Sequence, residues 1–132
     1  RGVDSSDPAE AAEQAATRLA RRVGCVVAVT GEVDLVTDGR RLARVRGGHP
    51  LMPRVTTLGC ALTGVVAAFL VGAEDPFEAT VAALACYGAA GRGAGQGARG
   101  PGSFAVAFLD ALHTLEGDAL DALPPLELHD AT

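Results

Sequence analysis

A loop that leads directly into an apolar helix is the stretch of this sequence best suited to chemistry. The polar residues before Gly59-Cys60 are followed at once by an apolar run with helical character. At a helix start the backbone N–H groups lack partners within the helix, and the helix dipole adds positive charge. We therefore expect Thr57, Leu58, Gly59 and Cys60 to form an anion-binding loop. The alternative interpretation of Cys60 is a small buried hydrophobic residue.

A second candidate site follows an apolar segment. Cys25-Val-Val-Ala-Val29 is rich in β-branched residues and predicts a strand buried on both faces, as in a parallel sheet. Open α/β sheets bind ligands at the carboxyl ends of their strands, so Thr30 and the residues up to Asp34 lie where a ligand would bind. The simpler interpretation of Thr30-Gly31 is a turn. The glycine-rich residues 91–102 predict a loop that could cover such a site.

The first half of the chain predicts one helix and one hairpin. Asp7 as cap, Pro8 and Glu10 predict a helix start, and Gly24 ends that helix after Val23. Leu19 and Val23 are expected to face inward. Residues 35–37 and 40–46 predict a hairpin with Asp38-Gly39 as its turn. Its second arm holds four arginines and is expected to be an exposed edge.

Three helices are predicted in the second half. The first spans about 59–71 and, being apolar nearly all round, is expected to be buried on most sides. The next starts at the cap Asp75 and ends near Gly91. The last runs to about Leu115, with Ser103 as a plausible cap. Residues 117–132 form an acidic tail in which we expect little order beyond a short turn at 120–123.

Composition excludes several classes of protein. The 132 residues carry a net charge of -5, all 11 basic residues are Arg, and no basic stripe for nucleic acid is present. The absence of Lys excludes the Lys-containing phosphate loop. Three widely spaced cysteines indicate neither a disulfide framework nor a zinc site, and no apolar run is long enough to span a membrane. We therefore expect a cytoplasmic protein.

The predicted elements indicate an α/β fold whose sheet needs further strands. A single strand buried on both faces requires neighbours, and the sequence starts at Arg1 without a Met. These two observations predict that the chain is part of a longer protein. Residues 1–116 would then belong to one domain, followed by the tail 117–132.

Several segments, in order and with matching spacing, resemble hydroxyethylthiazole kinases. The resemblance covers the chain up to about Leu115 and corresponds to the C-terminal half of such kinases. It rests on Val-Ala-Val-Thr-Gly-Glu-Val-Asp at 27–34, Val-Thr-Asp-Gly at 36–39, and Gly-Gly-His-Pro-Leu at 47–51. It also rests on Leu-Gly-Cys-Ala-Leu at 58–62, Gly-Pro-Gly-Ser-Phe at 100–104, Phe-Leu-Asp at 108–110, and residues 1–5.

The resemblance implies a ribokinase-like fold, with a mainly parallel sheet flanked by helices. It implies ATP-dependent phosphorylation of the hydroxyl of 4-methyl-5-(2-hydroxyethyl)thiazole in thiamine biosynthesis or salvage, with Mg²⁺ and a homotrimer. Thr30 matches the residue that contacts ATP, and Thr57 matches a substrate-binding position that is commonly glycine. Cys60 falls where related kinases carry a catalytic Asp, so it would orient the hydroxyl and take its proton. Arg54 would lie near the phosphates or be a solvated surface residue.

No metal ligands can be identified in this chain, since the residues that would hold thiazole and part of the Mg²⁺–ATP site are expected upstream. Two alternatives stay open. The first is a non-catalytic truncated or split fragment, and the second is a ribokinase-like kinase for another small alcohol. We expect these 132 residues, expressed alone, to be inactive.

Overall fold

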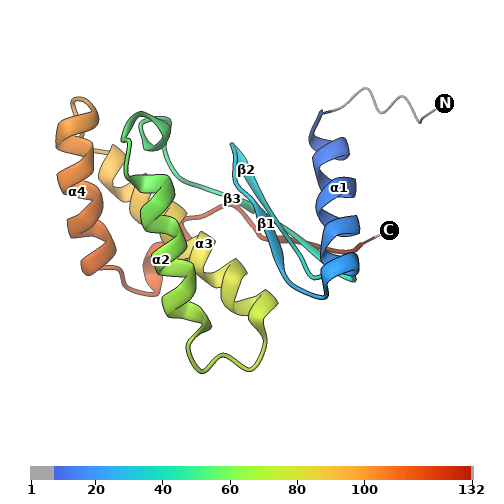
Figure 1. Cartoon of the computed structure of the whole chain (residues 1–132). Helices are drawn as coiled ribbons and strands as arrows, with labels where there is room; N and C mark the ends of the chain where they lie inside the picture. The colour runs from blue at the N-terminus through green and yellow to red at the C-terminus, as the bar shows by residue number, and fades with distance from the viewer. Residues whose placement is uncertain (1–7, 132) are drawn as a thin grey trace.

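A four-stranded sheet lies between the helices of the chain (Figure 1). The computed structural model describes residues 8–131. The strands are arranged in chain order, and every neighbouring pair is antiparallel. They are β1 (Val27–Val29), β2 (Val33–Thr37), β3 (Arg41–Arg46) and β4 (Glu127–Asp130). The α/β class is therefore confirmed. A mainly parallel sheet is not found among the described strands, because the links from β1 to β2 and from β2 to β3 are too short for a parallel crossover.

Two predictions for the strands are wrong. β1 is short and only partly buried, with Ala28 and the preceding Cys25 exposed, because β2 is its only strand neighbour within residues 8–131. β3 is not an exposed edge, since Leu42, Ala43 and Val45 are buried and β4 pairs with its outer side. The expected disorder of the tail is also contradicted. Glu127 of β4 is held by Arg46, whose Nε lies 3.0 Å from Oε1.

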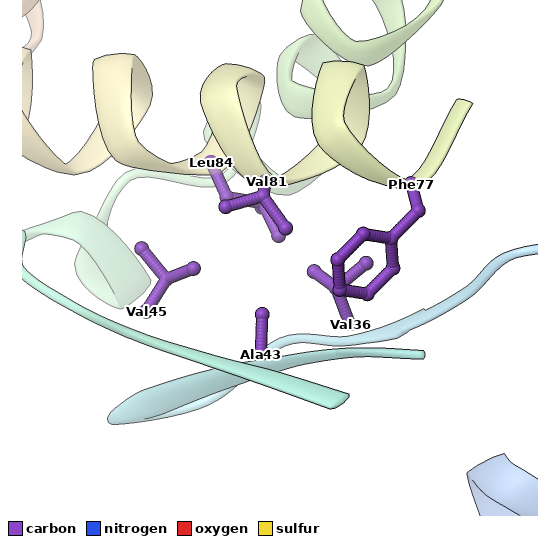
Figure 2. Close-up of a cluster of buried hydrophobic side chains, with 6 residues drawn as sticks. All are labelled: Val36, Ala43, Val45, Phe77, Val81 and Leu84. Atoms are coloured by element: carbon purple, nitrogen blue, oxygen red, sulfur yellow. The ribbon is translucent and has the colours of Figure 1, made fainter. Parts of the chain in front are cut away.

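One face of the sheet packs against the helix α3 (Pro76–Gly95). Figure 2 shows three apolar side chains of this helix pointing toward three strand residues. Alternate strand residues face the same side, which is why Val36, Ala43 and Val45 share this face. The cluster consists of Val36, Ala43, Val45, Phe77, Val81 and Leu84.

The helix α1 (Pro8–Val23) lies on the other side of the strands from α3 (Figure 1). Its buried residues are Ala16, Thr17 and Ala20, whereas Leu19 and Val23 are 48% and 54% exposed. The prediction that these two large residues face inward is wrong. Small residues make the contact instead and let the helix backbone lie close to its neighbours.

Local signals at element ends are largely confirmed. Gly24 has a φ of 65°, and its N–H donates to Ala20 O at 2.8 Å, which ends α1 as predicted. The Asp38-Gly39 turn joins β2 to β3, and Gly39 has a φ of 89°. Asp75 caps α3 by accepting from Phe77 N at 2.9 Å. The predicted cap Asp7 lies outside the described residues.

The remaining helices differ from the predictions in extent and burial. The helix α2 (Leu58–Leu70) has the predicted position, but Leu58 is its only buried residue, so burial on most sides is wrong. α3 continues to Gly95, which contradicts a loop beginning at Gly91. In the helix α4 (Pro101–His113), Gly100 holds the N-cap position and no side chain caps the start, so the prediction of Ser103 as the cap is wrong. A 3-10 helix η1 (Met52–Arg54) and a short α5 (Asp118–Asp121) complete the chain.

Candidate active site

The first turn of α2 presents backbone N–H groups on its outer side. Thr57 is the N-cap residue with φ −93° and ψ −13°, and its side chain makes no capping hydrogen bond. Leu58 N donates to Val55 O at 3.3 Å, and Ala61 N donates to Thr57 O at 3.0 Å. Among the described residues, the N–H groups of Thr57, Gly59 and Cys60 have no hydrogen-bond acceptor, whereas that of Leu58 is occupied. Within the helix itself, the two amides of Gly59 and Cys60 are thus available to an anion.

Cys60 is exposed, so the interpretation as a small buried residue is wrong. The buried member of this turn is Leu58, which is 5% exposed and packs in a second apolar cluster. That cluster also holds Tyr87, Ala90, Ala94, Phe104 and Phe108. The turn is consequently fixed on the side of Leu58 and open on the side of Gly59 and Cys60.

The segment that leads from β3 to α2 lies directly on the backbone of α3. Gly48 N donates to Gly88 O at 3.0 Å, and Gly48 has a φ of 83°. A Cβ on Gly91 would overlap Met52, and a Cβ on Gly95 would overlap the ring of His49. The glycines at 88, 91 and 95 recur at helical spacing and make room for this segment.

His49 and Tyr87 were not singled out from the sequence. The ring of His49 stacks on Phe104 with centroids 5.6 Å apart, and its Nδ1 accepts a hydrogen bond from Leu51 N at 3.3 Å. The hydroxyl of Tyr87 donates to Leu58 O at 2.6 Å. The only sequence signal for these contacts is the glycine spacing in α3, which shows where another segment can approach a helix closely.

Thr30 lies apart from the α2 turn. It is exposed and directly follows β1. At this same end of the sheet β3 ends, and the chain continues toward η1 and α2. Figure 1 shows the tip between β1 and β2 at the same end of the molecule as the start of α2. In the described part of the chain, no hydrogen bond joins Thr30 to residues 57–60. The two candidate regions therefore share one end of the fold without touching through a polar contact.

Asp34 closes the turn that begins at Thr30. Its Oδ1 accepts from Gly31 N at 2.9 Å. Burial raises the pKa of this carboxyl, and the Gly31 amide opposes that change. The residues 30–34 thus form a closed turn, which agrees with the simpler interpretation of Thr30-Gly31 and leaves the Thr30 hydroxyl exposed. Arg54 is also exposed, at the end of η1, which fits either of its two interpretations.

Within residues 8–131, no group of three or more His, Cys, Asp or Glu side chains could hold a metal ion. Mg²⁺ is usually bound through carboxylates, waters and substrate phosphates. Over the same residues, no helix combines the length and apolar character needed to cross a membrane.

Comparison with known proteins points to one family. A family model described as "Hydroxyethylthiazole kinase family" matches residues 1–118. The hydroxyethylthiazole kinase of Cereibacter sphaeroides (strain ATCC 17023) is 64% identical over 127 residues, which is 96% of this chain and 48% of the relative. The hydroxyethylthiazole kinase of Rhizobium etli (strain CIAT 652) is 62% identical over 122 residues, covering 92% of this chain and 47% of the relative.

A solved structure agrees with these relatives. The hydroxyethylthiazole kinase protein from Pyrococcus horikoshii OT3 has a TM-score of 0.83 and 35% sequence identity, covering 94% of this chain and 48% of that one. The chain thus spans about half the length of the proteins that it matches. Since the family match extends over residues 1–118, the chain belongs to the hydroxyethylthiazole kinase family.

Proposed function

We propose that this chain supplies the α2 side of the active site of a hydroxyethylthiazole kinase. The reaction is ATP-dependent phosphorylation of the hydroxyl of 4-methyl-5-(2-hydroxyethyl)thiazole, in thiamine biosynthesis or salvage. The observation that carries the proposal is the 64% identity to a relative of that name over 96% of this chain. The expected ribokinase-like sheet belongs to the same proposal, with the antiparallel strands described above as one part of it.

The proposed reaction is a transfer of the γ-phosphoryl group of ATP. The alcohol oxygen bonds to the γ-phosphorus, the bond from that phosphorus to the β–γ bridging oxygen breaks, and the hydroxyl proton leaves. Negative charge spreads over the transferred oxygens, so catalysis depends mainly on positioning and charge stabilisation. The unpaired N–H groups of Gly59 and Cys60 are suited to that stabilisation.

Each predicted site residue has a place in this proposal. The backbone at Thr57 contacts the thiazole, and Thr30 contacts ATP. Cys60 orients the substrate hydroxyl and, as the thiolate, accepts its proton, for which its exposure is a precondition. The family resemblance matches Thr57 to a position that is commonly glycine. The neighbouring Leu58 packs in the second apolar cluster, and this packing supports a fixed loop.

The cofactor and the assembly are part of the proposal as well. Mg²⁺ bound with ATP would neutralise phosphate charge, and its protein ligands would lie outside the described residues. We expect a cytoplasmic homotrimer that acts on small molecules. Sedimentation of the full-length protein as a monomer at micromolar concentration would contradict the trimer.

The test is ADP formation by the full-length protein, with and without the hydroxyethylthiazole and with a hydroxymethylpyrimidine as the competing alcohol. ADP formation that depends on the thiazole supports the proposal. Dependence on the pyrimidine instead would support a kinase for another small alcohol. No alcohol-dependent ADP formation with either compound would favour a non-catalytic protein.

A further inference from the structure

We propose that Tyr87 is a positioning residue that fixes the direction of the Gly59 N–H toward the transferred phosphoryl group. This inference rests on the proposed function. The hydroxyl of Tyr87 donates to the carbonyl oxygen of Leu58 at 2.6 Å, and this contact is buried. It joins the middle of α3 to the first turn of α2, where the candidate anion-binding amides lie.

The planarity of the peptide bond connects this contact to the outer side of the turn. The Leu58 carbonyl and the Gly59 N–H belong to one trans peptide unit, so they point in opposite directions within one plane. Holding the oxygen on the side of Tyr87 directs the N–H away from the core. Glycine at 59 adds no steric restraint of its own, so the Tyr87 hydrogen bond supplements the backbone of α2 in fixing the direction of this amide.

The hydroxyl itself is held by a row of packed rings. Tyr87 is 4% exposed and meets Phe108 edge to face, with centroids 4.8 Å apart. Phe108 stacks with Phe104 at 6.0 Å, and Phe104 stacks with His49 at 5.6 Å. Burial raises the pKa of Tyr87 to about 12, so the phenol keeps its proton and acts as the donor. The contact is therefore preorganised before substrate binds.

The test compares Tyr87→Phe with Thr80→Val in the full-length protein. Tyr87→Phe removes the hydroxyl and keeps the ring. Thr80→Val is the matched control. Thr80 is a buried residue of the same helix, and its hydroxyl also donates to a backbone oxygen, that of Pro76, at 2.7 Å. The Thr80 hydroxyl bonds within α3 and makes no hydrogen bond to α2. The measurements are kcat, KM for ATP, melting temperature, and amide hydrogen exchange in residues 58–62.

We expect Tyr87→Phe to lower kcat roughly five- to twentyfold, the effect of one well-placed hydrogen bond, with KM for ATP changed by less than about twofold. Exchange at the Ala61 amide, which donates to Thr57 O, should become faster. Thr80→Val should lower the melting temperature by a similar amount but leave kcat and the amide exchange of residues 58–62 unchanged. Equal kcat values in the two variants would overturn the inference.

Failure of the proposed function would be visible separately. If the unmodified protein forms no ADP with the thiazole, the proposed reaction is wrong, and the exchange measurement alone decides the role of Tyr87. Faster exchange in residues 58–62 in Tyr87→Phe only would then support the positioning of the turn. Unchanged exchange would overturn it.

Discussion

Arg41 binds Asp75 through two nitrogens and thereby joins the sheet to the start of α3. Nη1 lies 2.6 Å from Oδ2, and Nη2 lies 3.1 Å from Oδ1. The same guanidinium lies over the ring of Phe77, 4.3 Å from its centroid, and its Nε contacts Asp38 Oδ2 at 2.8 Å. Because Asp75 also caps α3, one arginine connects the hairpin turn, the helix start and the apolar core.

The two roles of Asp75 can be separated by substitution. Asp75→Ser keeps a side-chain oxygen that can cap α3 but loses the ion pair with Arg41, whereas Asp75→Ala loses both. We expect the melting temperature to fall in the order of the unmodified protein, Asp75→Ser and Asp75→Ala. Thermal unfolding followed by circular dichroism measures this order. Equal melting temperatures for the two variants would mean that the cap contributes nothing.

Acid should weaken the Arg41 cluster. Burial pushes the pKa of Asp38 upward, but the amides of Arg41 and Arg40 and the Arg41 guanidinium together lower it from 3.8 to about 2. The Arg41 side chain likewise lowers the pKa of Asp75, against a smaller effect of desolvation. The folded-state values lie below the unfolded ones. The stabilisation from Asp38 is therefore present above pH 3.8 and is lost as the pH falls toward about 2, and acid also weakens the contribution of Asp75.

Asp38→Asn tests that dependence, because asparagine keeps an oxygen for the Arg40 and Arg41 amides but does not titrate. Urea unfolding at several pH values between 5 and about 2.5 should show a steeper loss of stability in the unmodified protein than in the variant. Parallel curves would contradict the contribution of Asp38.

The part of the fold that could be predicted from the sequence is the part determined by neighbouring residues. Gly24, the Asp38-Gly39 turn and the Asp75 cap act within a few residues of themselves, so their effect is visible in the sequence. The pairing of β3 with β4 is different. Arg46 and Glu127 are 81 residues apart, and nothing in either segment alone specifies the other. The burial of β3 was therefore missed.

The candidate site divides in the same way. The unpaired amides at Gly59 and Cys60 follow from a glycine–cysteine pair before an apolar helix, and they were predicted. Tyr87 lies 29 residues after Leu58, and only the packing of α2 on α3 brings the two together. The apolar run at Cys25–Val29 does not encode whether its neighbour is parallel, so its antiparallel pairing with β2 could not be predicted from it.

Cys60 can be tested as the group that meets the substrate hydroxyl. In the full-length protein, Cys60→Ala should lower kcat more than it changes KM for ATP, because the side chain meets the alcohol and not the nucleotide. Cys60→Asp should retain activity, since a carboxylate can accept the proton. Cys25→Ala, another exposed cysteine located before β1, is the control and should be unchanged. A folded but inactive Cys60→Asp would contradict the role as a base.

Thr30 can be tested as a nucleotide contact. Thr30→Val removes one exposed hydroxyl and should weaken ATP binding by roughly 0.5–1.5 kcal/mol, the usual net value of one neutral hydrogen bond. Isothermal titration of the full-length protein with ATP measures the change. Thr114→Val removes a hydroxyl at the end of α4 and serves as the control. Affinity equal to that of the control would leave Thr30 as a turn residue only.

Two glycines of α3 should respond oppositely to alanine. A Cβ at Gly93 would meet no atom within 4 Å, so Gly93→Ala should stabilise the protein by about 0.5–1 kcal/mol through helix propensity. A Cβ at Gly95 would overlap the ring of His49, which stacks on Phe104 and accepts a hydrogen bond from Leu51 N. Gly95→Ala should therefore destabilise by about 1–3 kcal/mol, the usual range for overpacking.

Urea unfolding of both glycine variants measures the difference, since each substitution adds one methyl group to the same helix. Displacement of the His49 ring should also change amide exchange in the segment that contains His49. His49 lies in the segment that leads to α2, so Gly95→Ala should speed amide exchange in residues 49–58, whereas Gly93→Ala should not. Equal stabilities and equal exchange in the two variants would show that His49 can leave its position without cost, and that the glycine at 95 does not hold the segment against α3.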